Sequence, residues 1–551
     1  MLSAILLLGA LPFAAPSPAA SASSFAGSTL TAVYPPPSAT FSAFETFFPD
    51  AEQVGFAGPT PTGDEAEAIA TAPAAPQKLD TYPLLNPLTE KTGETPSFNP
   101  LRYWGNLAPW YSVGDAFGLP DASPQLPKGC ELTQVHLLHR HGARYPTSGE
   151  APSEFAELLN KVATTTGFEA SGPLEFLNTW TYKLGAELLT PFGRQQLYDL
   201  GVAFRVKYGD LLKGFTKLPV FRTTSEARMV DSALQFAAGF FGVQTYQQEY
   251  YELIIIEEDG FNNTLAPWNA CPVSNGPLDN LGTEAALNWS TVYLKDTIPR
   301  LQKYIKGIEL NNEDVVAMQE LCAYETVALG YSAFCDLFTE EEWKGFEYGN
   351  DLDFWYSDGP GQPTTAAQGI GYVQELVARL TKTPLTSFET SLNSTLDGSN
   401  VTFPLDQPIY VDATHDTVIS TVVTALNFTS LAANGPLPTD HIPKDQTYFV
   451  NQIAPFASNL VAQVMSCPAS AVTNSKSTSK ESYIRFLLND GVVPLTGIAH
   501  CEEANKFGLC PTANFIQGMQ QRIAEVDYNF DCFANYTLAM PDTLTNGRII
   551  R

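Results

Sequence analysis

Residues 139–147 read His-Arg-His-Gly-Ala-Arg-Tyr-Pro-Thr and place two arginines around one histidine, His141. Guanidinium groups match phosphate oxygens bidentately and stay charged at any working pH, while Gly142 lets the backbone come close to a ligand. The positive charges of Arg140 and Arg144 disfavour protonation of the imidazole, so His141 is predicted to stay a neutral nucleophile in mild acid. An Arg-His-Gly tripeptide alone is more often a basic surface turn, so the phosphate interpretation needs further support.

That support comes from a second pair of residues, His415 and Asp416, which follows a strand-like run at residues 408–413. The string at residues 140–147 resembles the signature of the histidine acid phosphatases, in a form close to that of fungal phytases. The same family carries a His-Asp pair at the end of a late strand. Ligands bind at strand ends in open α/β sheets, and both motifs stand at such an end.

The resemblance implies a role for each residue of the two motifs. His141 attacks phosphorus, and Asp416 protonates the leaving alcohol and then acts as base for the hydrolytic water. The phosphoryl oxygens are held by Arg140, Arg144 and His415. A carboxyl beside a bound phosphate has a raised pKa and keeps its proton in acid, which suits a proton donor. Asp416 is alternatively a cap for the helix that follows it.

A third phosphate-binding arginine is expected from the same resemblance. Arg222 ends the strand-like pair Val220-Phe221, and on this strand-end argument we predict that it fills the role. Arg228 is the competing candidate. His139 and His141 share a strand face and are an alternative metal site, but the flanking arginines would repel a cation. We therefore predict neither a metal nor a cofactor.

The resemblance covers roughly residue 99 to the C-terminus, with further landmarks at residues 368–381 and 489–495. Eight cysteines in an exported chain favour four disulfides, and spacing alone cannot choose the pairing. The family pattern implies that the pairs are Cys130 with Cys467, Cys271 with Cys532, Cys322 with Cys335, and Cys501 with Cys510. No Cys/His cluster has the spacing of a structural zinc site.

Strand and helix signals alternate beyond residue 100, which indicates an α/β fold. β-type runs occur at residues 135–139, 220–221, 253–256, 408–413 and 483–488, with helical spacing between them. The run at 253–256 is continuously apolar and is expected to be buried on both faces. The resemblance implies a histidine-phosphatase (phosphoglycerate-mutase-like) fold. In that fold a mixed α/β sheet domain carries a mostly helical inserted subdomain, and the active site lies between them.

We expect a signal peptide at residues 1–22, a Pro/Ser/Ala-rich extension at residues 23–98 and the phosphatase domain at residues 99–551. The α/β part is placed at about 128–150, 215–260 and 400–551, and the helical part at about 151–214 and 261–399. Short apolar pieces of the extension, such as residues 41–48, are candidates for docking on the folded body.

Charge, hydropathy and glycosylation sequons bear on the partners and the location of the protein. The chain has 30 basic and 59 acidic residues and a pI near 4.5, which argues against a nucleic-acid partner. No run beyond the signal peptide is long and apolar enough to span a membrane, so the chain is predicted to be secreted. Six sequons are candidate glycosylation sites, at Asn262, Asn288, Asn393, Asn400, Asn427 and Asn535.

The sequence predicts a small phosphomonoester as substrate, phytate or a similar compound, but two departures leave the choice open. Phytases of this group commonly have asparagine where this chain has Thr417, and often a lysine where it has Ser148-Gly149-Glu150. A broad-range acid phosphatase with little phytate preference is therefore the first alternative. A non-catalytic secreted phosphate-binding protein and a metal-dependent phosphatase are further alternatives, and a phosphoglycerate mutase is disfavoured by export and by the His-Asp pair.

Overall fold

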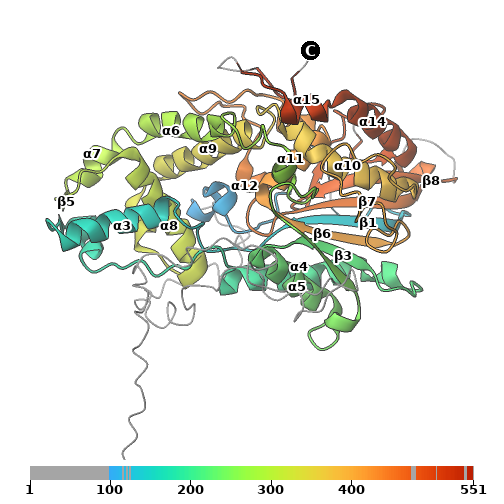
Figure 1. Cartoon of the computed structure of the whole chain (residues 1–551), viewed down its shortest axis with the longest axis horizontal. Helices are drawn as coiled ribbons and strands as arrows, with labels where there is room; N and C mark the ends of the chain where they lie inside the picture. The colour runs from blue at the N-terminus through green and yellow to red at the C-terminus, as the bar shows by residue number, and fades with distance from the viewer. Residues whose placement is uncertain are drawn as a thin grey trace, which may run out of the picture.

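A mixed β-sheet forms the centre of the molecule (Figure 1). The computed structural model describes residues 98–114, 117–119, 122, 124, 126–472, 479–503, 505–538 and 543–549, so the predictions for residues 1–97 lie outside it. The strands lie in the order β10-β8-β7-β1-β6-β3-β4, with β9 beside β8. Their bounds are β1 Glu131–Arg140, β3 Val220–Thr224, β4 Tyr251–Ile255, β6 Ile409–Thr414, β7 Asn459–Pro468, β8 Lys480–Leu488, β9 Gly491–Val493 and β10 Cys510–Pro511.

The central strand β1 brings the two sequence motifs together. It runs parallel to β6, with Arg140 opposite Thr414, and antiparallel to β7 on its other side. The six residues of β6 are all buried, as are the last six of β1, which suits strands covered on both faces. Because β1 and β6 are parallel and in register, the residues that follow them emerge side by side at one edge of the sheet.

Helices cover both faces of this sheet (Figure 1). On one face lie α4 (Pro191–Tyr208) and α5 (Ala227–Phe241), whose Phe204, Phe236 and Phe240 pack with Phe221 of β3. On the other face lie α10 Thr365–Thr381, α11 Asp416–Ala425 and α14 Thr512–Glu525. Short helices complete this part, at α12 Val450–Ile453, α13 Ala469–Val472 and α15 Tyr528–Phe533.

A helical part stands beside the sheet (Figure 1), and much of it packs around a second hydrophobic core. It contains α3 Ala151–Thr164, α6 Asn280–Tyr293, α7 Thr297–Gln302, α8 Asn312–Leu329 and α9 Glu340–Ser357, with the small strand pair β2 Glu169–Ala170 and β5 Ile305–Lys306. Capping boxes at Asn311 and Thr339 start α8 and α9, because each side chain accepts a bond from the third residue of its helix. Leu321 and Phe334 are fully buried in its core.

The boundary between the two parts differs from the one that the sequence predicts. Helices α4 and α10 fall within residues 151–214 and 261–399, which were assigned to the helical part, yet both pack on the sheet. An amphipathic helix has the same 3.6-residue pattern whether its apolar face meets a helix or a sheet. Sequence spacing therefore located these helices but not their partners.

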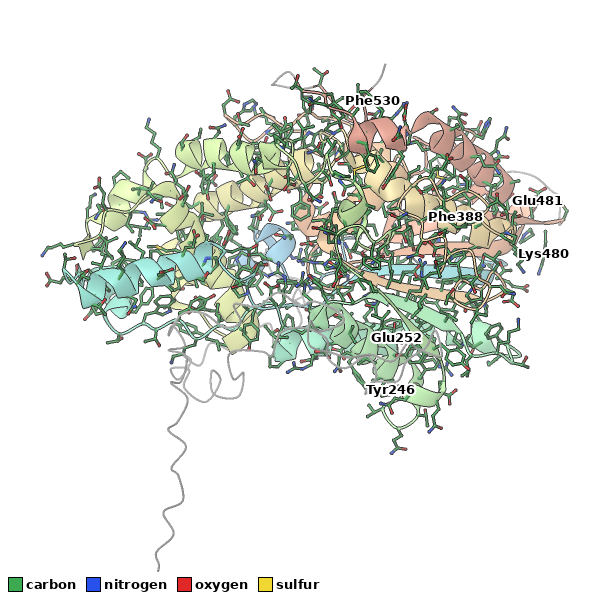
Figure 2. All side chains as sticks on the ribbon, viewed as in Figure 1. Tyr246, Glu252, Phe388, Lys480, Glu481 and Phe530 are labelled. Atoms are coloured by element: carbon green, nitrogen blue, oxygen red, sulfur yellow. A yellow bond between two sulfur atoms is a disulfide. The ribbon has the colours of Figure 1, made fainter. Side chains whose placement is uncertain are left out.

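Strand β4 is also placed differently, at the edge of the sheet. Within the apolar run at residues 253–256, Leu253 and Ile255 are buried but Ile254 and Ile256 are only partly buried, so the run is fully covered on one face and not on both as predicted. Figure 2 shows Glu252 and Tyr246 on the side of the molecule that carries α4 and α5. The Tyr250 hydroxyl donates to Glu252 Oε2 at 2.8 Å, which gives that carboxyl a local partner.

Four disulfides tie the described chain. They join Cys130 to Cys467, Cys271 to Cys532, Cys322 to Cys335 and Cys501 to Cys510, the pairing that the family pattern implied. The first links the start of β1 to the end of β7, and the second links distant segments of the α10 face. No helix within the described ranges is long and apolar enough to cross a membrane.

Candidate active site

The backbone fixes His141 from both sides. Its N–H donates to the carbonyl of Thr414 at 3.1 Å, and its carbonyl accepts from the N–H of Ala457 at 2.9 Å. Gly142 follows at a point where a Cβ atom would lie 2.2 Å from the carbonyl oxygen of Gly193, so a side chain there would displace backbone. The signature loop is therefore held against the first turn of α4, and glycine is the residue that permits this contact.

The side chain of His141 presents one nitrogen to the site. Its Nδ1 lies 2.8 Å from the Gly142 carbonyl, which only accepts hydrogen bonds, so Nδ1 carries the proton and Nε2 keeps its lone pair. The side chain is 1% exposed, and burial lowers its pKa well below the usual range. The charges of Arg140, Arg228 and Arg144 lower this pKa further. A neutral, orientated imidazole in mild acid follows from these contacts.

Arg140 and Asp416 form an ion pair beside this imidazole. Arg140 Nη2 lies 2.6 Å from Asp416 Oδ2, and Asn106 Nδ2 donates to the same oxygen at 2.9 Å. Burial acts to raise the pKa of Asp416, but Arg140 and the Asn106 bond outweigh it and hold that pKa below the usual value. Burial lowers the pKa of Arg140 to about 10, so Arg140 remains charged in acid. In the ligand-free site Asp416 is thus a carboxylate.

Arg144 reaches the same region from the turn that follows β1. Its Nη1 donates to the carbonyl of Tyr145 at 3.0 Å and lies 3.5 Å from the hydroxyl of Tyr324 on α8. A backbone bridge to Leu189 holds this turn in place. Arg144 therefore connects the site to α8 of the helical part. Its charge is one of those that lower the pKa of His141.

The third arginine of the cluster is Arg228, and the prediction of Arg222 is wrong. Arg228 is the second residue of α5, and its charge acts on His141 more strongly than that of Arg144. Two carboxylates flank it, with Nη1 2.9 Å from Glu187 Oε2 and Nη2 2.5 Å from Glu226 Oε2. Arg228 was weighed only as a competitor because it lies beyond the strand, in the first turn of the next helix.

Arg222 instead belongs to a buried ion-pair network within the sheet. Its Nε donates to Asp412 at 2.6 Å, and both terminal nitrogens donate to Glu375 of α10. Arg379 binds the other oxygen of Asp412 at 2.6 Å. All three nitrogens of Arg222 are thus engaged by carboxylates, and its side chain is 2% exposed. Each of its nitrogens therefore already binds a carboxylate within the sheet network.

The three site arginines each keep an unused donor. In the described chain, Nε of Arg140, Arg144 and Arg228 is buried without a hydrogen-bond partner. Buried guanidinium N–H groups are costly to leave unpaired, so this arrangement is suited to an anion with several acceptor oxygens. A phosphoryl group meets that requirement, because guanidinium forks bind it bidentately.

His415 completes the site at the start of α11. Its ring lies edge-on to His141 with centroids 5.9 Å apart, and Trp268 packs on its other side at 5.1 Å. Its Nε2 lies 3.0 Å from Glu257 Oε2. Burial acts to raise the pKa of Glu257, but the bond and charge of His415 lower it overall. Glu257 therefore fixes the ring of His415.

We tested whether the described residues could hold a metal at this point. Ligand atoms of Glu226, Glu257 and His415 lie within 4.8 Å of one another. However, Arg228 is ion-paired to Glu226, so a guanidinium already provides the positive charge there. His139, considered with His141 as a metal pair, stacks on Phe236 at 5.3 Å and is directed into the α5 interface.

Two residues of the site had no sequence signal. Asn106 lies in a short 3₁₀ helix, Gly105–Leu107, far upstream of the motifs, and Glu257 follows the edge strand β4. Both reach the site because the fold brings these loops to the carboxyl ends of β1 and β6. Neither stands at a recognisable spacing from a motif, so only the arrangement of strands reveals them.

The six sequons divide into two groups. Asn288, Asn400 and Asn535 are exposed. The side-chain amide of Asn262 donates to the carbonyls of both Thr390 and Leu392, and those of Asn393 and Asn427 also donate to backbone carbonyls. A glycan on Asn262 would require these bonds to break, so the exposed group offers the better acceptors.

Comparison with known proteins first places the fold. The structure resembles the phytase of D. castellii with a TM-score of 0.63 at 26% sequence identity, over 80% of this chain and 88% of the other. It also resembles the multiple inositol polyphosphate phosphatase of Bifidobacterium longum complexed with inositol hexasulfate, with a TM-score of 0.51 at 13% identity, over 71% and 92% of the two chains. The fold and the site thus define a phosphatase of the histidine-phosphatase class.

The sequence comparisons identify the family. The model of the histidine phosphatase superfamily (branch 2) matches residues 131–489. Phytase A of Aspergillus fumigatus is 34% identical over 434 residues, covering 76% of this chain and 87% of that protein. Phytase A of Emericella nidulans is 34% identical over 437 residues, covering 76% and 88%. The chain belongs to branch 2 of the histidine phosphatase superfamily, within the group of the fungal phytases, and is a phytase or acid phosphatase.

Proposed function

We propose that this chain is a secreted acid phosphatase that hydrolyses phosphomonoesters, phytate among them, through a phosphohistidine on His141. The observation that carries the proposal is the bond from Nδ1 to Gly142, which leaves Nε2 as the nucleophilic atom beside three arginines with unused donors. We include phytate among the substrates because the similar fungal proteins are named as phytases.

In the first step Nε2 of His141 attacks phosphorus and the bond to the ester oxygen breaks. Arg140, Arg144 and Arg228 bind the equatorial oxygens, where charge is stabilised in the transition state. The departing alkoxide takes a proton from Asp416, because an alkoxide is a poor leaving group. The products of this step are the free alcohol, the Asp416 carboxylate and phosphohistidine.

Asp416 must first gain that proton, since its pKa is held low in the ligand-free site. A bound phosphate competes with Asp416 for Arg140 and adds negative charge, and both effects raise the pKa of the carboxyl. The second ionisation of a phosphate has a pKa of about 6, so a substrate bound in acid arrives with a proton that Asp416 can accept. This coupling supports activity in acid.

In the second step water attacks phosphorus and the bond to Nε2 breaks. The Asp416 carboxylate formed in the first step accepts a proton from this water. Phosphate leaves and His141 returns to its neutral form. No atom or charge remains unbalanced, because Asp416 gives one proton in the first step and recovers one in the second.

Replacement of the nucleophile tests the proposal. His141→Ala is expected to abolish turnover, and wild-type protein quenched in acid during the reaction should carry phosphate on a histidine of the peptide that contains residue 141. His441→Ala, which changes an exposed histidine, is the matched control and should leave activity intact. More than a few per cent of residual activity in His141→Ala, or label on another residue, would contradict the assignment.

A broad-range acid phosphatase is the second candidate, and one observation favours it. Glu187 and Glu226 both pair with Arg228, which makes this side of the site less positive. The absence of a lysine at residues 148–150 has the same effect. Comparison of kcat/KM for phytate, glycerol phosphate and p-nitrophenyl phosphate decides between the two, because a phytase prefers phytate and a broad-range enzyme does not.

Secretion is part of the proposal. Four disulfides require an oxidising compartment, and the relatives are fungal phytases with the same domain. The Ala20-Ser21-Ala22 sequence is the expected cleavage site of the signal peptide. N-terminal sequencing of the protein from culture medium tests this directly.

A further inference from the structure

A groove lies on the α4 face of the molecule, behind the signature loop. Its volume is about 310 Å³, and it is lined by Phe192, Leu200 and Phe204 of α4. Pro109 and Trp110 also line it, as do Val461 of β7 and Leu487 of β8. A hollow of this size and lining accepts large apolar side chains. We refer to it as the α4 groove.

The apolar surface extends out of the α4 groove along the helix. Ala203 is exposed at the rim, Val202 is 39% exposed and Val206 is 82% exposed. The 3.6-residue period of α4 places Val202 and Val206 along the same side as the groove-lining Asp199 and Ala203. A hollow that continues into exposed valines is more typical of a binding surface than of the free surface of a secreted enzyme.

The lining of the α4 groove contacts the backbone of the active site. Ala457 lines the groove and donates its N–H to the carbonyl of His141 at 2.9 Å. Gln196 also lines it, and its Oε1 accepts from the N–H of Ala143 at 2.9 Å. An occupant of this groove would therefore press on residues that are one hydrogen bond away from the nucleophile loop.

We propose that residues 41–48 of this same chain occupy the α4 groove. Their sequence is Phe-Ser-Ala-Phe-Glu-Thr-Phe-Phe, so four of the eight aromatic residues in the stretch 23–97 stand within eight positions. If the segment were helical, Phe44, Phe47 and Phe48 would share one face, because they are three and four residues apart. Aromatic side chains gain from edge and stacking contacts with aromatic walls, which Trp110, Phe192 and Phe204 provide.

The length of the preceding chain fits this occupant. The described structure begins at Phe98, and twelve residues later Trp110 lines the groove. The connection at residues 49–97 is rich in proline and polar residues and spans the distance with ease at about 3.3 Å per extended residue. Because the segment is tethered, its effective concentration at the groove is of millimolar order, which a free partner would rarely reach.

Hydrogen exchange on the full-length secreted protein tests the proposal. Amides of residues 42–48 should exchange at least about tenfold more slowly than those of the acidic stretch at residues 62–72, which serves as the internal reference. Ala203→Trp fills the groove from an exposed position and should remove that protection. Phe44→Ser combined with Phe47→Ser should do the same from the side of the segment.

Matched controls separate docking from general effects of substitution. Ala163→Trp changes an exposed alanine of α3, outside the groove, and Phe56→Ser removes a phenylalanine of the same extension outside the segment. Both should leave the protection of residues 42–48 unchanged. All four variants should keep phosphatase activity measurable, which confirms that the protein is folded in each comparison.

Three results would overturn the proposal. The first is equal exchange of residues 42–48 and 62–72 in the wild type. The second is a mature N-terminus beyond residue 48, found by intact mass. The third is a concentration-dependent dimer, measured by light scattering, that is weakened by Ala203→Trp but not by the Phe44/Phe47 variant. In that case the groove would bind a second copy of the chain. The proposal predicts that Ala203→Trp and the Phe44/Phe47 variant both remove the protection of residues 42–48. It also predicts that the two control variants leave this protection unchanged.

Discussion

Two groups of arginines lie along the same sheet and have opposite uses. Arg222 and Arg379 are surrounded by Asp412, Glu375 and Asp397, and every nitrogen of Arg222 donates to a carboxylate. The site arginines, Arg140, Arg144 and Arg228, lie near His141, and their charges lower its pKa. The charges of Arg222 and Arg379 instead lower the pKa of the buried Asp412. The first group stabilises a carboxylate of the sheet, and the second surrounds the imidazole of the candidate site.

This difference teaches what distinguishes a binding arginine from a structural one. Proximity to a strand end does not decide it, because Arg222 is two residues from the end of β3. The number of carboxylate partners does not decide it either, because Arg228 also has two, Glu187 and Glu226. What differs is that all three nitrogens of Arg222 donate to carboxylates, whereas Nε of Arg228 is buried without a partner in the described chain. Arg228→Ala and Arg222→Met compare the two groups directly, and changes at Asp416 and Glu325 compare a buried carboxyl that has an arginine partner with one that has none among its hydrogen-bond partners.

The largest effect is expected from the carboxylate of the site cluster. Asp416→Asn keeps the size of the side chain but removes the proton donor, so single-turnover cleavage of phytate or glycerol phosphate should slow by about 10²- to 10⁴-fold. p-Nitrophenyl phosphate should be affected much less, because its leaving group is a stable anion. Rapid-quench release of the alcohol or phenol measures this. Equal losses on both ester types would mean that Asp416 only positions phosphate.

Removal of a site arginine should reduce activity with a smaller loss of stability than removal of the network arginine. Arg228→Ala is expected to lower kcat/KM by about 10²- to 10³-fold, because it removes one donor to the charge that develops on the phosphoryl group. The midpoint of urea unfolding should fall less than for Arg222→Met, because Glu187 and Glu226 are 12% and 20% exposed, whereas Glu375 and Asp412 are 0% and 1% exposed. Arg194→Ala, which changes a half-exposed arginine of α4, is the matched control. An unchanged kcat/KM for Arg228→Ala would remove this residue from the site.

Removal of the network arginine should have the reverse outcome. Arg222→Met leaves Glu375 and Asp412 buried with one partner fewer, and breaking a buried ion pair typically costs about 3 to 5 kcal/mol of unfolding free energy. The kcat of the protein that remains folded should be close to wild type. Urea titration with activity measured below the transition tests both statements, with exposed Arg205→Met as control. Normal stability combined with a lost kcat would restore Arg222 as a phosphate ligand.

The smallest effect concerns buried carboxyls with no arginine at all. Glu325 of α8 accepts bonds from Trp180 and Ser332, and burial raises its pKa to about 7. Because the folded pKa exceeds the unfolded one, the native state holds a proton that the unfolded state has released. The stability that this group contributes is fully present below about pH 4.5 and is lost as the pH rises towards 7.

The free energy of unfolding should therefore decrease less between pH 4.5 and 7 in Glu325→Gln than in the wild type, by about 1 to 3 kcal/mol. The measurement is urea unfolding at a series of pH values, with Glu157→Gln on the exposed side of α3 as control. Asp412 is the opposite case, because Arg222 and Arg379 outweigh burial and lower its pKa below the usual range. A pH slope that Glu325→Gln leaves unchanged would show that other groups cause it.

The structure brings together most residues of the predicted site, because they stand at the ends of strands that lie side by side. Arg140 ends β1 and His141 and Arg144 follow it, while His415 and Asp416 follow β6. Their catalytic roles stay predictions. Arg222 was mistaken because strand position does not give the direction of a side chain or its partners. Asn106 and Glu257 come from loops that the fold alone brings to this edge.

The fold was predictable in kind but less so in its packing. Apolar runs located the strands, and helical spacing located α4 and α10. The surface that each helix covers was not encoded in that spacing, because a sheet and a helix bury the same kind of apolar face. The edge position of β4 was likewise invisible, since the number of neighbours of a strand depends on residues far away in the chain.

The central position of β1 has a consequence for biosynthesis. β1 ends at Arg140, but its neighbours β6 and β7 begin only at Ile409 and Asn459. A ribosome adds roughly 5 to 20 residues per second, so about 300 residues and some 15 to 60 seconds separate the synthesis of His141 from that of both strands that flank β1. During that interval β1 has no strand to pair with on either side, and the candidate site is not assembled. Activity therefore begins only after nearly the whole chain has been made, a point at which an exported protein has already entered its secretory compartment.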